Sequence, residues 1–330
     1  MSKRVFLSVD GGGTKLRMLL FDDCFRVLGE GLCGGVNQNS TTEADARANV
    51  RDCLLKVFTQ GVPEAISKLY YVFVGNAGLL LDGLTELTKV NEAVPMSEPV
   101  AGLLSGALWR SGILALSGTG SDVFLVPGGS PPLSMAGSER LVVGAWGPIL
   151  GDDGSGVWIG HRAVRAAIAG LEGWAEPTVI MDLIRRDWQL KHDRSMCDIV
   201  YRSHAPFRKL GSLTKIVGEA ARMEDKVAQG ILCEAGRLMA AQTVCLVNRF
   251  RIPAEDYRLV SCGGAWKAHP LMFEAFRKEL AVFCPGLPVR RHRFEHVMAG
   301  PALEMLEATG DAACAEGCLA ERFPAYVVNW

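Results

Sequence analysis

The stretch SVDGGGTKLRMLLFD, residues 8–22, decides the fold because two apolar segments meet at a run of three glycines. The residues up to Asp10 and those after Thr14 are rich in apolar side chains, and each segment predicts a β-strand. A Walker A loop is excluded because Lys15 follows Thr14 without the required glycine spacing. A dinucleotide-binding loop would continue into a helix, whereas KLRMLLFD predicts a strand. The stretch therefore predicts the tip of a β-hairpin.

This hairpin tip has the chemistry of a phosphate-binding loop. Its glycines allow backbone N–H groups to approach an anion, and its threonine adds a hydroxyl donor. A carboxylate at Asp10 would repel a phosphate unless a divalent cation lies between them, so we predict Asp10 on the side of a bound Mg²⁺ ion. The nucleotide-binding residues predicted here are Gly11, Gly12, Gly13, Thr14 and Lys15.

Two further glycine turns repeat this pattern. LSGTGSD at 116–122 lies between two apolar segments, and SCGGAWK at 261–267 follows a predicted strand. The echo between the first two turns favours two related halves that offer glycine hairpins to a shared cleft, although unrelated tight hairpins would look the same. The predicted nucleotide-binding residues in these turns are Gly118, Thr119, Gly120, Gly263 and Gly264.

The chain of 330 residues is long enough for two domains, and its 49% hydrophobic content is typical of a globular protein. Strand-like and helix-like segments alternate over the first 120 residues, which indicates an α/β fold. Helical periodicity dominates from about 160 to 250, before β-type sequence returns near 260. We therefore expect an α/β protein with one domain at 1–116 and a second, with extra helices, at 117–330.

Charge, hydropathy and cysteine content indicate which binding partners and which cellular compartment to expect. A formal net charge of -1 gives no reason to expect nucleic acid or an anionic membrane as a partner. No apolar run near the roughly 20 residues of a membrane span is evident, and no signal peptide, so we expect a cytoplasmic protein. The ten cysteines include no Cys-x-x-Cys pair. We expect reduced thiols, with an iron–sulfur or zinc site as the alternative.

The three glycine turns, in this order, resemble those of the sugar kinase, actin and heat-shock-protein ATPase superfamily. The chain is most similar to the N-acetylglucosamine kinases of the BadF/BadG/BcrA/BcrD ATPase family, and the resemblance covers nearly the whole chain. Its most specific part is GAWGPILGDDGSGVWIGHRAVR at 144–165. The resemblance implies two ribonuclease H-like domains that close around a nucleotide cleft. It also implies ATP and Mg²⁺, phosphorylation of an amino sugar (N-acetylglucosamine at its 6-hydroxyl), and a homodimer.

The resemblance also implies roles for single residues. Thr14 and Thr119 match threonines at the nucleotide phosphates, and Ala221 falls where the family contacts the nucleoside. The substrate-binding residues that it implies are Asn37, Ser121, Asp122, Trp146 and Asp152. Asn37 also suits a plain turn, Asp152 a helix start, and Trp146 a packed aromatic.

Two positions depart from the family pattern. The general base of the family is an aspartate, and counting back from the second glycine turn places Glu98 there. Its longer side chain leaves three outcomes open: a base with a shifted acceptor, a weak kinase, or another ligand. Glu98 also suits a plain helix start, since Pro99 follows it. Asp122 replaces an asparagine, and its charge favours a ligand with an amine, such as glucosamine.

Two other functions therefore stay open. One is an ATPase that switches another enzyme, as the dehydratase activators of the family do with a cysteine-bound iron–sulfur cluster. The cysteine spacing in this chain does not support such a cluster. The other is a sugar-binding sensor with little or no kinase activity.

Overall fold

The structure, a computed structural model, describes residues 4–38, 41–128, 141–203, 205–253 and 256–330. These residues form two compact units. The first unit contains the described residues of Met1–Gly112, Val126–Glu139 and Arg291–Asn329, and the second contains those of Ile113–Leu125, Arg140–Arg290 and Trp330. This division differs from the sequence-based boundary at 116/117, because residues after Arg291 pack against the N-terminal strands.

The first unit is built on a five-stranded sheet with the strand order β3-β2-β1-β5-β7. β1 pairs antiparallel with β2, which closes the predicted glycine hairpin, and parallel with β5. The strands are β1 (Val5–Gly11), β2 (Lys15–Asp22), β3 (Val27–Gly34), β5 (Lys68–Phe73) and β7 (Ala93–Pro95). A separate pair consists of β4 (Ala65–Ile66) and β6 (Lys89–Val90).

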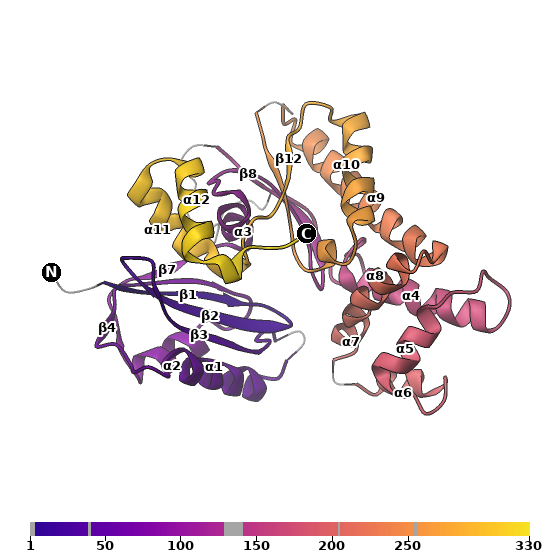
Figure 1. The fold of residues 1–330 in the computed structure, drawn as a ribbon, viewed down its shortest axis with the longest axis horizontal. Coiled ribbons are helices and arrows are strands. Elements are labelled where there is room, and N and C mark those ends of the chain that lie inside the picture. Colours follow the sequence, from indigo (N-terminus) through magenta and orange to yellow (C-terminus); the bar gives the residue numbers. More distant parts are fainter. Residues whose placement is uncertain (1–3, 39–40, 129–140, 204, 254–255) are drawn as a thin grey trace. The chain divides into compact units, whose positions relative to one another are not determined.

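Helices cover both faces of this sheet (Figure 1). α1 (Glu43–Val57) and α2 (Gly78–Thr85) lie on one face, where apolar residues of α1 join those of β1 and β2 in one core. α3 (Glu98–Ala107), α11 (Ala299–Thr309) and α12 (Ala312–Arg322) lie on the other face. The short turns η2 (His296–Met298) and η3 (Pro324–Tyr326) flank the last two helices. η2 contacts β1, β2 and α3, which brings the end of the chain to the first hairpin.

The second unit repeats the same sheet order. Its five strands run β10-β9-β8-β11-β12, with an antiparallel β10–β9 pair and a parallel β8–β11 pair. Their bounds are β8 (Gly112–Ser117), β9 (Ser121–Val126), β10 (Val142–Gly144), β11 (Leu259–Cys262) and β12 (Val289–Arg291). The second glycine turn therefore occupies the position that the first turn has in its own sheet, as the sequence echo predicted.

The extra helices expected from the sequence lie mainly between β10 and β11 (Figure 1). They are α4 (Gly156–Leu171), α5 (Ile180–Trp188), α6 (Ser195–Tyr201), α7 (Pro206–Ser212), α8 (Thr214–Arg222) and α9 (Lys226–Arg249), with η1 (Ala265–Lys267) and α10 (Pro270–Phe283) after β11. Among the described residues, α9 alone has the length and hydropathy of a membrane span. Half of that span is buried in the unit. Because α9 packs on α10, α8 and α4, this burial is that of a core helix.

Two helical glycines give a matched test of this packing. A Cβ atom at Gly160 of α4 would overlap the carbonyl oxygen of Leu210 in α7, whereas one at Gly230 of α9 would meet nothing within 4 Å. We expect Gly160→Ala to lower the free energy of unfolding by about 1–3 kcal/mol through overpacking. Gly230→Ala should raise it by about 0.5–1 kcal/mol, because alanine loses less entropy in a helix. Denaturant unfolding measures both, and equal effects would contradict the α4–α7 packing.

Candidate nucleotide and acceptor site

The first glycine hairpin is tightly closed by its own backbone. The N–H of Gly12 donates to the carbonyl oxygen of Lys15 at 2.9 Å. Gly11 is required by packing, because a Cβ atom there would lie 2.8 Å from the ring of Phe73. At Gly12 the nearest atom to such a Cβ would be 3.9 Å away. Packing within the protein therefore does not require glycine at position 12, and the missing side chain leaves space for a ligand beside the turn.

The second and third glycine turns lie against each other in the second unit. Gly263 has a φ of +109°, and a Cβ atom there would overlap the carbonyl oxygen of Ser117. By contrast, a Cβ atom at Gly118 or Gly264 would meet nothing within 4 Å. Each of the three turns thus contains a glycine that neither packing nor a positive φ demands. Such positions suit close approach of a ligand to the backbone.

Asp152 faces the second glycine turn. Its Oδ1 accepts a hydrogen bond from the N–H of Gly147 at 3.1 Å, and a Cβ atom at Gly120 would lie 2.6 Å from its Oδ2. Burial raises the pKa of Asp152, although hydrogen bonds from the backbone of Gly147 and Ser121 oppose this shift. Asp152 does not cap the following helix, since Ser155 does so by accepting from Trp158 N. The Asp152 carboxylate is therefore not used as a helix cap.

The segment around Asp152 has an unusual backbone. Ala145 and Asp152 have φ values of +62° and +57°, which non-glycine residues rarely adopt. Such conformations are concentrated at functional sites. The Trp146 side chain is 72% exposed, and its Cβ atom lies beside Gly151. Trp146 is therefore not a core aromatic, which removes the packing alternative for this residue.

Ser121 and Asp122 begin β9 next to this segment. The hydroxyl of Ser121 donates to the carbonyl oxygen of Asp153 at 2.9 Å, so it helps to hold the segment in place. Asp122 is partly buried and pairs with Gly144 across the β9–β10 ladder. The structure thus brings Ser121, Asp122 and Asp152 into one neighbourhood of the second unit.

Asp10 lies at the end of β1 and contacts a histidine. Its Oδ1 is 3.1 Å from Nδ1 of His296, and both side chains are 14% exposed. Burial by itself would raise the pKa of Asp10, but the charge and hydrogen bond of His296, helped by Lys15, hold that pKa below its ordinary value. For His296 burial is likewise outweighed by Asp10 and Glu98, so the pKa of its imidazole is raised.

Glu98 is the first residue of α3 and belongs to the same unit as Asp10. Burial raises the pKa of Glu98, the negative charge of Asp10 raises it further, and His296 opposes both effects. The acidic residue found by counting along the sequence therefore lies within electrostatic reach of the predicted metal-side carboxylate. Two acids with opposite pKa shifts are a common arrangement for acid–base chemistry.

The other predicted residues are placed as follows. Thr14 is exposed at the hairpin tip, and Asn37 is partly buried beside Gly75. The ammonium of Lys15 forms an ion pair with Glu295 at 3.2 Å. Ala221 is 2% exposed and packs in the core of the second unit, so its side chain offers no surface to a nucleoside. Any nucleoside contact at this position would involve its neighbours or its backbone.

The surroundings of Asp10 fit a bound Mg²⁺ ion. The lowered pKa keeps the carboxylate ionised, and Oδ1 is the oxygen that His296 engages. Asp10 would hold a bound Mg²⁺ ion through one of the waters of the ion. Mg²⁺ prefers oxygen ligands and keeps several waters, so a single carboxylate is an adequate protein contribution.

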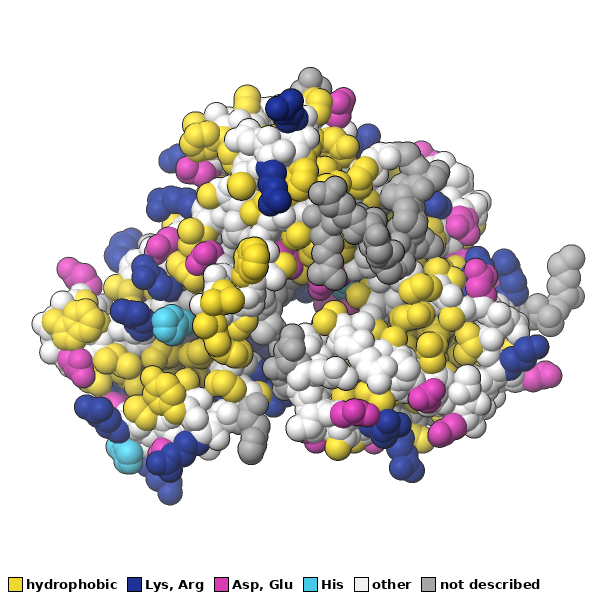
Figure 2. Space-filling view, turned by 180° about the vertical axis from the view of Figure 1, so that it is seen from behind, with side chains coloured by type: hydrophobic (Ala, Val, Ile, Leu, Met, Phe, Trp, Pro, Cys, Tyr) yellow, Lys and Arg dark blue, Asp and Glu magenta, His cyan; other side chains and the backbone are white. Residues whose placement is uncertain are grey.

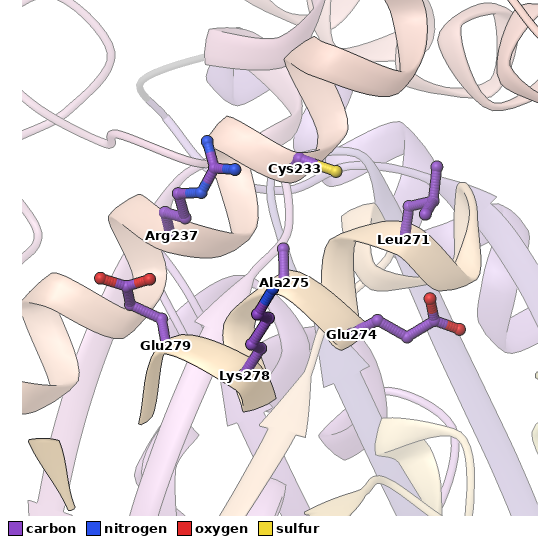
Figure 3. A pocket seen from close by; sticks show the side chains of 7 residues that line it. All are labelled: Cys233, Arg237, Leu271, Glu274, Ala275, Lys278 and Glu279. Carbon is purple, nitrogen blue, oxygen red and sulfur yellow. The ribbon is translucent and has the colours of Figure 1, made fainter. Parts of the chain in front are cut away.

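A groove elsewhere on the second unit does not coincide with these residues. It lies between α9 and α10 (Figure 3), and its lining residues are Cys233, Arg237, Leu271, Glu274, Ala275, Lys278 and Glu279. None of the predicted site residues lines it. Acidic and basic side chains are interspersed on the surface shown in Figure 2, consistent with the net charge of -1. The candidate functional residues are therefore the glycine turns and carboxylates of each unit, described separately above.

The chain belongs to the BadF/BadG/BcrA/BcrD ATPase family, whose sequence model matches residues 7–293. An N-acetylmuramic acid/N-acetylglucosamine kinase of Clostridium acetobutylicum is 26% identical over 291 residues, covering 86% of this chain and 92% of that protein. An N-acetyl-D-glucosamine kinase of Dictyostelium discoideum is 24% identical over 300 residues, covering 88% and 94%. These matches confirm the family that the glycine turns indicated.

The fold is also similar to that of solved structures. A candidate N-acetylglucosamine kinase from Chromobacterium violaceum has a TM-score of 0.63 at 23% identity, over 92% of this chain and 99% of that one. The likeness confirms the predicted fold class, an α/β protein built from two ribonuclease H-like units of the actin-like ATPase type.

The sequence analysis missed His296. It lies 286 residues from Asp10 along the chain. The only local signal is a histidine immediately before the segment VMAGPALEM, which predicts a helix. A lone histidine beside an apolar helix is usually a packed residue, so the sequence could not have identified its partner.

The third glycine turn offers a matched pair of variants. We expect Gly264→Ala to change the free energy of unfolding by less than about 0.5 kcal/mol, because its Cβ atom would enter open space. The same methyl group should weaken ADP binding about tenfold or more, a loss of about 1.4 kcal/mol, by blocking approach to the backbone.

Gly263→Ala should instead destabilise the fold by more than about 1 kcal/mol, because of its positive φ and the overlap with Ser117. Calorimetric titration with ADP and thermal unfolding separate the two effects. Unchanged ADP affinity in Gly264→Ala would remove this turn from the nucleotide site.

Proposed function

We propose that this protein is an ATP- and Mg²⁺-dependent kinase of an amino sugar, with N-acetylglucosamine as the acceptor and its 6-hydroxyl as the phosphorylated group. Membership of an ATPase family supports the nucleotide part of this proposal. The two curated relatives, both kinases of N-acetylated amino sugars, support the acceptor part.

The observation that carries the proposal is the group formed by Asp10, His296 and Glu98, in which His296 contacts Asp10 at 3.1 Å and the charges of both residues act on Glu98. Phosphoryl transfer to a hydroxyl needs a group that accepts the hydroxyl proton and a negative group on the metal side of the phosphates. The raised pKa of Glu98 and the lowered pKa of Asp10 match these two roles. A plain helix-start acid would be exposed and would not experience the charge of a buried neighbour.

In this mechanism Glu98 accepts the proton of the acceptor hydroxyl as its oxygen attacks the γ-phosphate. Because burial raises the pKa of Glu98, its carboxylate is a stronger base than an exposed glutamate. The lowered pKa of Asp10 keeps its carboxylate ionised, and this carboxylate would hold a bound Mg²⁺ ion through water. Mg²⁺, when bound, neutralises charge on the phosphate oxygens.

Binding of both substrates is assigned to the remaining residues. Thr14 and Thr119 would donate hydroxyl hydrogen bonds to the nucleotide phosphates, next to the space that the missing side chains of Gly12 and Gly118 leave. Hydroxyl groups of a sugar both donate and accept, so polar side chains suit them. We assign the acceptor to Asn37, Ser121, Asp122, Trp146 and Asp152.

The same proposal includes a cytoplasmic location and a homodimer. All ten cysteines are free thiols, as is usual in a reducing compartment. The homodimer rests on the family resemblance alone.

An ATPase that acts as a switch on another protein is the second candidate. The description of the family as ATPases and the glutamate at position 98 favour it. It differs from a kinase in one measurable way, because its ATP turnover does not require a sugar. A sugar-binding sensor would bind the sugar without turnover.

Replacing Glu98 tests the assigned base. We expect Glu98→Ala or Glu98→Gln to lower kcat for transfer by about 10²- to 10⁴-fold, the usual contribution of a general base. ADP binding, measured by calorimetry, should be unchanged. In the wild-type protein kcat/KM should fall as the pH drops through the raised pKa of Glu98, at a higher pH than the ordinary value of about 4.3.

Glu43→Ala is the matched control, because Glu43 is an exposed acid in the first turn of α1. Its transfer rate should equal that of the wild type. Transfer retained in Glu98→Gln would show that the base is assigned wrongly.

An acceptor panel tests the function itself. ADP release should be measured with N-acetylglucosamine, N-acetylmuramic acid, glucosamine and no sugar. We expect the rate with N-acetylglucosamine to exceed the rate without sugar by tenfold or more, about 1.4 kcal/mol of transition-state stabilisation. Equal rates in all four reactions would favour the ATPase switch.

Asp122→Asn is the matched specificity variant for the same panel. The negative charge of Asp122 should favour an amine over a neutral acetamide. The ratio of the glucosamine rate to the N-acetylglucosamine rate should therefore fall in Asp122→Asn. An unchanged ratio would exclude Asp122 from recognition of the amino group.

A further inference from the structure

We propose that His296 is a positioning residue for phosphoryl transfer, whose Nδ1–H holds the Asp10 carboxylate in its working orientation beside Glu98. This inference rests on the proposed function, and it adds a residue for which the sequence provided no role.

The chain brings His296 to Asp10 through contacts that do not involve the imidazole. The hydroxyl of Ser8 in β1 donates to the carbonyl oxygen of Val297 at 2.6 Å and accepts from the N–H of Gly300 at 3.3 Å. On the other side, the N–H of Phe294 donates to Ser105 of α3 at 3.0 Å. Hydrogen bonds on both sides of His296 in the sequence therefore hold the turn in place without the help of the histidine side chain.

The hydrogen bond determines which nitrogen carries a proton. Asp10 is ionised and can only accept, so Nδ1 of His296 must donate. This assignment holds for both the neutral and the charged imidazole. A hydrogen bond from His296 at 3.1 Å restricts the rotation of the Asp10 carboxylate, which favours one orientation toward a metal ion.

The second ring nitrogen strengthens the functional interpretation. Nε2 of His296 is buried and has no hydrogen-bond partner among the described residues. The charged side chains that act on the imidazole are Asp10, Glu98 and Lys15. A histidine kept only for packing would not be expected to leave a buried nitrogen unsatisfied while two carboxylates act on its ring.

Loss of the Nδ1 donor should affect the reaction more than the fold. Misplacement of a group by ~1 Å can cost about a hundredfold in rate. The orientation of Asp10 should also affect how much Mg²⁺ strengthens nucleotide binding, which can be measured without a sugar.

Two variants separate the two nitrogens. In His296→Asn the side-chain amide can donate from near the Nδ1 position, whereas in His296→Gln it reaches the Nε2 position and cannot replace Nδ1. His192→Gln, a substitution of an exposed histidine in the second unit, is the control. For each protein we would measure thermal unfolding, kcat and KM with N-acetylglucosamine, and the affinity for ADP with and without Mg²⁺ by calorimetry.

We expect His296→Gln to lose about a hundredfold in kcat with little change in the KM for the sugar, and to lose the gain in ADP affinity that Mg²⁺ gives the wild type. His296→Asn should retain that gain and most of kcat, and His192→Gln should match the wild type. The proposal is overturned if the Gln and Asn variants behave alike, or if Mg²⁺ strengthens ADP binding equally in all four proteins.

A wild-type protein without transferase activity would contradict the proposed function but not the role of His296. In that case the Mg²⁺-dependent binding of ADP still tests whether His296 orients Asp10.

Discussion

The buried hydroxyl of Ser8 is the contact on which the rest of the first unit depends. It hydrogen-bonds to Val297 and Gly300 at once, so the turn η2 and the start of α11 lie directly against β1. A Cβ atom at Gly300 would lie 2.7 Å from this hydroxyl, which shows how closely the two segments approach. Because the turn is held there, α11 covers one face of the sheet and His296 reaches Asp10.

The two units share a sheet order but differ in chemistry at equivalent positions. Asp10 precedes the first glycine turn, and Ser117 precedes the second. The hydroxyl of Ser117 is buried and donates to the carbonyl oxygen of Gly154 at 2.8 Å, so this position braces the loop that contains Asp152. The residue just before the glycine turn is therefore an acid, Asp10, in the first unit. In the second unit it is Ser117, whose hydroxyl makes a structural hydrogen bond. A common fold does not by itself assign function to its sites.

Two acids of the first unit, Asp10 and Glu98, have pKa values shifted in opposite directions. His296 contacts Asp10 and holds the pKa of that carboxyl below its ordinary value, whereas burial and the negative charge of Asp10 raise the pKa of Glu98. A single histidine acts on both carboxylates, so its placement influences the orientation of one and the basicity of the other. This coupling supports the proposal that Glu98 accepts the proton of the acceptor hydroxyl.

Much of the fold could be predicted from the sequence alone, because its signals are local. Glycine runs between apolar segments predicted both hairpins, and helical periodicity predicted the helices between about 160 and 250. Tertiary structure decided what depends on distant contacts. In the tertiary structure, the residues from Arg291 to Asn329 belong to the first unit, and His296 contacts Asp10. Ser155, and not Asp152, caps the following helix, and Asp152 faces a glycine turn. The tertiary structure also shows that packing requires glycine at position 263, whereas at position 264 a side chain would enter open space. Local propensity acts over a few residues, whereas burial and close approach arise only when segments hundreds of residues apart pack together.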